Sequence, residues 1–289
     1  MCNSNDKRVT VMIIAIASGK GGTGKTTVST SLALSLEGEV QLLDCDVEEP
    51  NASIFIKPKI VNKKPVFIFV PQVNREKCIL CGKCAEVCAF NAIAVIAEKV
   101  LVYPELCHSC GACQFFCPKN AIQEVEKKIG TIEFGEKNHI KFVNGRLNIG
   151  EVMSIPVIKE VKKYLDKSKI VVIDAPPGTS CPMIESVRGC DFCILVTEPT
   201  PFGLNDLILA IELLRKMRIP FGVVINRSDL GNQNVEDYCK NGNIIVLTAI
   251  PFQKEIAVGY SKGIPLIEIA PKYKDIFFGL LEKIQNILK

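Results

Sequence analysis

Eight cysteines in the middle of the chain have the spacing of metal ligands. The pattern C-x2-C-x2-C-x3-C occurs twice, and residues 78–93 and 107–122 are identical at eight of sixteen positions. This internal repeat predicts a pseudo-two-fold unit. Three thiolates so close together suit one face of an iron–sulfur cubane better than a zinc ion, which takes four ligands of ordinary spacing. A pair of zinc sites is the alternative interpretation.

The cysteine repeat resembles bacterial-type ferredoxins across residues 74–125. In that run the fourth cysteine of each copy binds the other cluster. The resemblance therefore implies two 4Fe–4S clusters with exchanged ligands. The first cluster is expected on Cys78, Cys81, Cys84 and Cys117, and the second on Cys107, Cys110, Cys113 and Cys88.

Gly19–Thr26 fits the phosphate-binding pattern G-x-x-x-x-G-K-T between a predicted strand and a predicted helix. Its glycines let backbone N–H groups converge on phosphate oxygens, and the helix N-terminus adds partial positive charge. We expect Lys25 to reach the β- and γ-phosphates and Thr26 to bind Mg²⁺. The expected nucleotide contacts are Gly21, Gly22, Thr23, Gly24, Lys25, Thr26 and Thr27.

Three further stretches extend this pattern into a family resemblance. The sequence K-G-G-T-G-K-T-T resembles the deviant Walker A motif of MinD/ParA/nitrogenase-iron-protein ATPases. Asp44-Cys45-Asp46 with Asn51 is similar to switch I of that class, and Asp174-Ala-Pro-Pro-Gly is similar to switch II. Asn226-Arg227 resembles its purine-contacting strand end. Together with the cysteine repeat, the chain resembles MinD/Mrp-like ATPases that contain an inserted ferredoxin domain.

The resemblance implies roles for individual residues. Lys20 is expected to reach the nucleotide of a partner subunit in an ATP-dependent homodimer. Asp46 would orient the attacking water, and Asp174 would hold Mg²⁺ through water. Asn226, followed by Arg227, would hydrogen-bond the adenine. Both carboxylates end predicted parallel strands, where open α/β sheets bind ligands. The alternatives are a solvated loop acid for Asp46 and a plain turn for Asn226.

Predicted strands and helices alternate on both sides of the cysteine repeat, which predicts a parallel sheet covered on both faces. We expect an α/β fold: a mostly parallel doubly wound P-loop sheet with a small inserted ferredoxin-type α+β domain. The predicted strands are Val9–Ala17, Val40–Leu43, Ile170–Ile173, Phe192–Val196, Phe221–Ile225 and Ile244–Leu247, and the helices Thr26–Leu36, Val157–Leu165, Leu204–Met217 and Asp275–Leu288.

The expected domains are an ATPase part over residues 1–64, the insert over 65–126 and a second ATPase part over 127–289. Asn144-Gly145 is a hairpin signal in the second part. The apolar stripe at the C-terminus favours a core helix over a membrane-binding amphipathic helix.

Composition limits the remaining choices. The chain has 289 residues, is 48% hydrophobic and carries a net charge of +4, too mild to predict nucleic-acid binding. The polar Met1–Arg8 and the apolar Val9–Ala17 only loosely resemble a signal peptide. We therefore expect a cytoplasmic protein, in which the fourteen cysteines bind metal rather than form disulfides.

These features predict an ATPase that couples the nucleotide state of a dimer to electron transfer, or to metal-cluster assembly, on a client protein. One alternative is a ParA/MinD-type positioning ATPase with structural or sensory clusters. Another is an Mrp-like cluster carrier, although Cys190 and Cys193 do not match the late C-x-x-C of that group. Strand alternation would place these two cysteines on opposite faces. Cys181 follows the switch II motif, and its role stays open.

Overall fold

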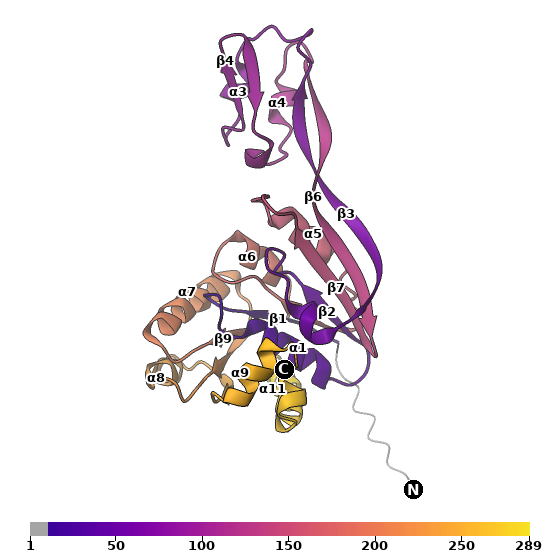
Figure 1. Cartoon of the computed structure of the whole chain (residues 1–289). Helices are drawn as coiled ribbons and strands as arrows, with labels where there is room; N and C mark the ends of the chain where they lie inside the picture. The colour runs from indigo at the N-terminus through magenta and orange to yellow at the C-terminus, as the bar shows by residue number, and fades with distance from the viewer. Residues whose placement is uncertain (1–10) are drawn as a thin grey trace.

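The computed structural model describes residues 11–289, and these form two parts joined by a twisted ribbon (Figure 1). The larger part contains a sheet with helices on both faces, and the smaller part carries the cysteine repeats. The first predicted strand is present as β1 (Ile13–Ala17). Val9 and Thr10 of that prediction, and the polar Met1–Arg8, lie outside the described residues.

A nine-stranded sheet in the order β11-β10-β9-β1-β8-β2-β7-β6-β3 forms the larger part. The first seven strands of this order are parallel to one another. The mostly parallel α/β sheet predicted from the sequence is therefore confirmed. Besides β1 these strands are β2 (Val40–Asp44), β7 (Ile140–Leu147), β8 (Ile170–Asp174), β9 (Phe192–Thr197), β10 (Phe221–Asn226) and β11 (Val246–Ile250).

Helices cover both faces of this sheet, as strands buried on both sides require. One core contains apolar residues of α1 (Lys25–Ser35), α2 (Ala52–Ile56), α10 (Leu266–Ile269) and α11 (Lys272–Ile287), with partly buried Ile256 of α9 (Lys254–Ser261). The other contains α5 (Ile155–Lys162), α6 (Cys181–Val187), α7 (Pro201–Met217) and α8 (Asn234–Asn241).

The C-terminal helix α11 packs on the sheet, as predicted. Its apolar stripe is buried in the core at Tyr273, Phe277, Leu280, Leu281 and Ile284. Within residues 11–289, no helix combines the length and the apolar composition that crossing a membrane would require.

The ribbon that joins the two parts consists of β3 (Lys59–Val73) and β6 (Ile122–Lys137). The two strands pair antiparallel along their whole length, and the C-terminal half of β6, from Gly130 to Lys137, also pairs with β7. The expected domain boundaries at 64/65 and 126/127 therefore fall inside continuous strands. The small part is an outgrowth of the sheet edge and is attached by two strands rather than by loops.

The predicted hairpin at Asn144-Gly145 is wrong. The turn between β6 and β7 is formed by Asn138-His139, where Asn138 has φ 52. Asn144 and Gly145 lie inside β7 instead. A Cβ at Gly145 would lie 2.6 Å from Val47 Cγ1 and 2.7 Å from Val161 Cγ2. The glycine therefore permits close packing against the strand and does not form a turn.

The small part repeats its local structure as its sequence does. It contains α3 (Lys83–Glu86), β4 (Ile93–Ile96), β5 (Lys99–Val102), the short helix η1 (Pro104–Leu106) and α4 (Ala112–Phe115). Gly82 and Gly111 precede α3 and α4 with φ of 75 and 70. The two halves thus make equivalent turns around their cysteines.

Candidate functional site

A cavity lies at the carboxyl edge of the parallel strands. Predicted nucleotide-binding residues from three separate loops line it, so the fold brings these loops together. Those that line it are Gly21, Gly22, Gly24, Lys25, Thr26, Thr27, Asp46, Asn226 and Arg227. Lys20, Thr23 and Asp174 do not.

The phosphate-binding loop closes tightly before α1. Gly24 has φ 96, and α1 begins at Lys25, which is 6% exposed. Asn226 Nδ2 donates to the carbonyl oxygen of Thr23 at 2.8 Å. A Cβ at Gly24 would lie 2.5 Å from that same nitrogen. Only glycine fits at this position, and Asn226 holds the loop as well as facing the cavity.

Two carboxyl groups lie near Lys25. Burial raises the pKa of Asp46 to about 7, opposed by Lys25 and assisted by the charge of Asp174. Burial likewise raises the pKa of Asp174 to about 6, again opposed by Lys25. Asp46 lines the cavity together with Lys25. An acid with a raised pKa at such a position is typical of functional sites.

Asp174 has the environment of a metal-associated carboxylate. It is 1% exposed, and neither of its carboxyl oxygens has a hydrogen-bond partner among residues 11–289. The hydroxyls of Thr26 and Ser29 lie close enough to lower its pKa. Buried oxygens without donors are costly unless a cation or ordered water completes them. This arrangement fits Mg²⁺ held between Thr26 and Asp174.

Asp44 shapes the candidate site, a role that was not predicted from its sequence context. Its Oδ1 accepts from Asp46 N at 3.2 Å, and its Oδ2 accepts from Ala52 N at 3.0 Å. The carboxyl group therefore shapes the loop that carries Asp46. Its position after an apolar strand and two residues before Asp46 was the available signal.

The far end of the cavity is apolar and was not predicted. Phe252, Ile256, Tyr260 and Leu266 line it. The ring of Tyr260 lies 4.8 Å from that of Phe55. These residues come from the segment after β11, where no helix was predicted before Asp275. Their rings and alkyl groups form a suitable surface for a flat base.

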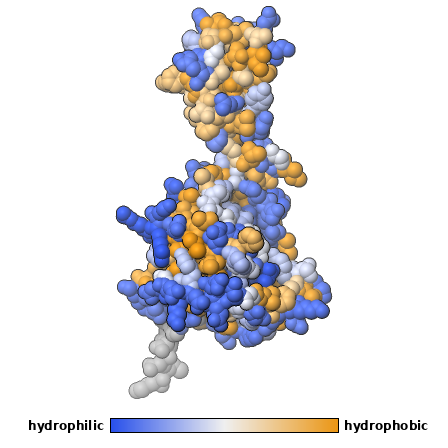
Figure 2. Space-filling view, turned by 90° about the vertical axis from the view of Figure 1, so that its left-hand side faces the viewer, coloured by the Kyte–Doolittle hydropathy of each residue, from blue (hydrophilic) through white to orange (hydrophobic). Residues whose placement is uncertain are grey.

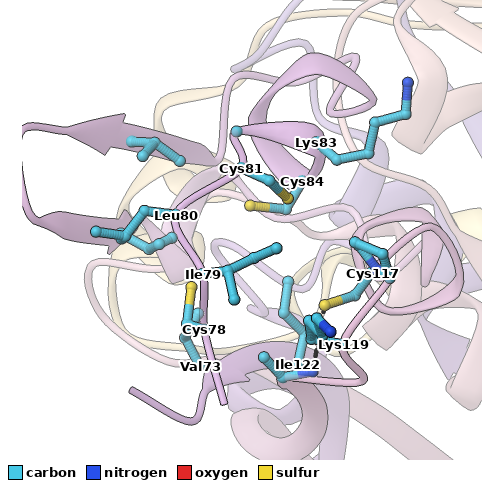
Figure 3. Close-up of a pocket in the computed structure, with 15 residues that line it drawn as sticks. Val73, Cys78, Ile79, Leu80, Cys81, Lys83, Cys84, Cys117, Lys119 and Ile122 are labelled. Carbon is cyan, nitrogen blue, oxygen red and sulfur yellow. Dashed lines mark hydrogen bonds between the residues drawn. The ribbon is translucent and has the colours of Figure 1, made fainter. Parts of the chain in front are cut away.

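The four cysteines assigned to the first cluster line one cavity. Figure 3 shows Cys117 across this cavity from Cys78, with Cys81 and Cys84 on a third side. The backbone N–H of Ala121 donates to Cys117 Sγ at 3.2 Å. Such N–H bonds to sulfur stabilise thiolate ligands. Sequence-distant Cys117 therefore stands with the first three cysteines.

The other four cysteines, Cys88, Cys107, Cys110 and Cys113, line a second cavity. Ala92 N donates to Cys88 Sγ at 3.3 Å, which repeats the contact of the first half. Burial raises the pKa of Cys113 to about 11. Its thiolate would therefore need a bound metal at neutral pH.

No group of three or more His, Cys, Asp or Glu side chains in the described part of the chain is arranged to hold a single metal ion. A cubane makes a different demand, because its four thiolates each bind a different iron and stand around the cluster. Two cavities lined by four cysteines each have the donor set that two cubanes would take.

Among the described residues, five further cysteines lie in the larger part: Cys45, Cys181, Cys190, Cys193 and Cys239. Cys190 and Cys193 are 9% and 0% exposed and belong to the same apolar core, so the prediction that they lie on opposite faces is wrong. The reason is that Cys190 precedes β9 and does not follow its alternation. Cys181 is exposed at the first position of α6.

The chain matches the family model of the CobQ/CobB/MinD/ParA nucleotide binding domain over residues 14–266. It therefore belongs to this family of nucleotide-binding P-loop proteins. Its fold is similar to that of the septum site-determining protein MinD of Pyrococcus horikoshii, solved with Mg-ADP, at a TM-score of 0.58 and 21% identity, covering 96% of this chain and 97% of that one.

Relatives extend over nearly the whole chain. An uncharacterized protein of Methanocaldococcus jannaschii is 34% identical over 284 residues, which cover 96% of this chain and 98% of the relative. A second uncharacterized protein of that organism is 31% identical over 281 residues, 96% of this chain and 97% of the relative. An iron-sulfur cluster carrier protein of Pyrococcus horikoshii is 25% identical over 307 residues, 96% of this chain and 86% of the carrier.

Proposed function

We propose that this protein is an ATP-hydrolysing iron–sulfur protein. In it, the nucleotide state of a homodimer is coupled to electron transfer, or to metal-cluster assembly, on a client protein. The observation that carries the proposal is the arrangement of the eight cysteines. Each predicted set of four lines its own cavity, on a ribbon that continues the nucleotide-binding sheet.

The residues of the cavity divide the nucleotide chemistry among them. Lys25 would bind the β- and γ-phosphates, and Thr26 with Asp174 would hold Mg²⁺, which neutralises charge on the transferring phosphoryl group. Asp46 lies near enough to Lys25 for the lysine to lower its pKa. In the proposed reaction, Asp46 orients the attacking water.

The loop that carries Asp46 contacts the ribbon through β7. The carbonyl oxygen of Val47 accepts from Leu147 N at 2.8 Å, and Val47 packs on Gly145. On the same strand, Asn144 stands opposite Asp44 in the β2–β7 register. A change in the nucleotide loop would therefore move β7 directly.

A polar chain continues from β7 into the ribbon. Asn144 Nδ2 donates to Glu133 Oε2 at 3.1 Å on β6, and Glu133 pairs with Lys63 on β3 at 2.6 Å. Both strands lead to the cysteine-bearing part. These contacts give the proposed coupling a contiguous physical path between the two sites.

The surface of the small part supports a protein client. Figure 2 shows apolar residues over much of this part, whereas the larger part is mostly hydrophilic on the same side. Phe115 is 82% exposed between two cluster cysteines, and Ile79 is 58% exposed between two others. Exposed apolar groups gathered in this way often mark sites of protein association.

The alternative functions have less support. A cluster carrier of the Mrp type would use a late accessible cysteine pair, whereas Cys190 and Cys193 are buried. A positioning ATPase has no need for two four-cysteine cavities connected to the nucleotide loop.

The test is anaerobic purification followed by iron analysis and by ATP hydrolysis assays with the clusters oxidised and then reduced. We expect about eight irons per chain, as two cubanes require, and a hydrolysis rate that changes on reduction. Eight irons with identical rates in both states would favour structural clusters and the positioning function.

A further inference from the structure

Lys20 is held away from the nucleotide cavity of its own chain. It belongs to the phosphate-binding loop, yet it does not line the cavity that its neighbours Gly21 and Gly22 line. Its Nζ lies 3.7 Å from Glu198 Oε2. Glu198 follows β9, whose neighbours in the sheet are β1 and β10. The carboxylate therefore stands between the loop after β1 and the loop after β10.

The second partner of Glu198 is Arg227, which follows the neighbouring strand β10. Arg227 NH1, at the end of β10, donates to Glu198 Oε1 at 2.6 Å. Arg227 lines the nucleotide cavity. The carboxylate of Glu198 thus pairs with two cations: Arg227, which lines the nucleotide cavity, and Lys20, which does not.

The backbone around Glu198 leaves it little freedom. Its carbonyl oxygen accepts from Thr200 N at 2.8 Å, and a Cβ at Gly203 would lie 2.2 Å from that oxygen. A Cβ at Gly231 would lie 1.8 Å from the carbonyl oxygen of Pro199. Two glycines therefore permit neighbouring segments to close on residues 198–199. The backbone that carries Glu198 is therefore closely packed, and its side chain is 11% exposed.

The two contacts of Glu198 differ in strength. The bond to Arg227 is short and charge-assisted, which is the stronger kind. The contact with Lys20 exceeds hydrogen-bond distance, and 31% of the lysine side chain is exposed. Lys20 can leave without stranding the buried charge of Glu198, because Arg227 still neutralises it.

We propose that Glu198 is a positioning residue that holds Lys20 away from the nucleotide in the isolated chain. When two chains meet, Lys20 leaves Glu198, which stays paired with Arg227, and becomes free to contact the second chain. The second step rests on the proposed homodimer, whereas the first does not.

The first test measures the reactivity of the Lys20 amine without nucleotide. Wild type, Glu198→Gln and Glu198→Asp are treated with an amine-acetylating reagent, and modification of Lys20 is quantified by peptide mass spectrometry. We expect acetylation of Lys20 to rise about threefold in Glu198→Gln, since an ion pair of this exposure shifts an equilibrium by a few-fold. Glu212→Gln, on the exposed face of α7, is the matched control.

Glu198→Asp keeps a charge for Arg227 but is one methylene shorter, so we expect more modification of Lys20 than in wild type. If Glu198→Gln does not fold, the comparison of Glu198→Asp with wild type serves as the test. Equal modification of Lys20 in wild type and in every folded Glu198 variant would overturn the proposal.

The second test measures dimerisation by sedimentation with Mg²⁺ and an ATP analogue that is not hydrolysed. We expect Glu198→Gln to dimerise at about threefold lower protein concentration than wild type. Unchanged or weaker dimerisation of this variant would overturn release of Lys20 as a step in association. If wild type and variant both stay monomeric, the proposed homodimer and the release step are both wrong, and the acetylation result decides the holding role of Glu198.

Discussion

Asp44 and Asp174 lie opposite each other on the adjacent parallel strands β2 and β8, and both side chains are buried. Burial raises the pKa of Asp44 well above its ordinary range, and the charge of Asp174 raises it further. The two acids on neighbouring strands thus lie close enough to interact, and Lys25 is the cation that opposes the raised pKa of Asp174. The carboxylate of Asp174, which has no hydrogen-bond partner among residues 11–289, is costly without a ligand and would suit Mg²⁺.

The stability of the ligand-free protein should decrease as pH rises from about 5 to about 7.5. The pKa of Asp174 is raised to about 6 and that of Asp46 to about 7, whereas both groups titrate near 3.9 in an unfolded chain. The folded state therefore binds more protons in this interval, and the free energy of unfolding falls with pH. Thermal unfolding in EDTA measures this trend, and Asp46→Asn should weaken it. A melting temperature that rises over the interval would contradict these pKa shifts.

Replacing Asp174 should separate stability from activity. Asp174→Asn removes a buried like charge beside Asp44, so we expect the ligand-free protein to melt no lower than wild type. It also removes the group that would hold Mg²⁺, so ATP hydrolysis should fall by about two orders of magnitude. Thermal unfolding and steady-state hydrolysis check the two effects. Hydrolysis close to the wild-type rate would exclude the assigned role.

Cysteine variants test how the ligands are divided between the clusters. Replacing Cys117 by alanine should remove the same cluster as replacing Cys78, although the two are far apart in sequence. Replacing Cys88 should remove the other cluster. Each variant should retain about four irons, and the remaining cluster can be identified by its reduction potential. Cys181→Ala is the control and should retain all the iron. A Cys117 variant that resembles a Cys107 variant would refute the exchange of ligands.

Gly145→Ala should disturb the contact between the nucleotide loop and β7. Its methyl group would lie 2.6 Å from Val47 Cγ1 and 2.7 Å from Val161 Cγ2. Overpacking of this kind costs about 1–3 kcal/mol. Gly279→Ala in α11 is the matched control, because a Cβ there meets nothing within 4 Å. Denaturant unfolding compares the two variants, and equal stability would contradict the packing described for β7.

Alternating apolar runs predicted the parallel strands, and two short motifs predicted much of the site. The spacing of residues in the P-loop and in the cysteine repeats indicates phosphate and metal binding within a few residues of sequence. The carboxyl-edge positions of Asp46 and Asp174 followed from apolar strands that end in an acid. Long-range geometry was not predictable. Gly145 is a packing glycine only because Val47 and Val161 approach it, and a sequence shows neither. Glu198 pairs with Lys20 and Arg227 across three strands. Tyr260 lines the cavity from α9, a helix that was not predicted.

The central claim is that the nucleotide site and the cysteine-bearing part affect each other. Coupling of binding free energies is reciprocal, so nucleotide must shift the reduction potential of the clusters if their redox state shifts nucleotide affinity. The most direct measurement is a redox titration with Mg-ADP and with Mg²⁺ and a non-hydrolysed ATP analogue. We predict different midpoint potentials, by about 59 mV for each tenfold coupling of a one-electron step. Identical potentials with both nucleotides would contradict the account.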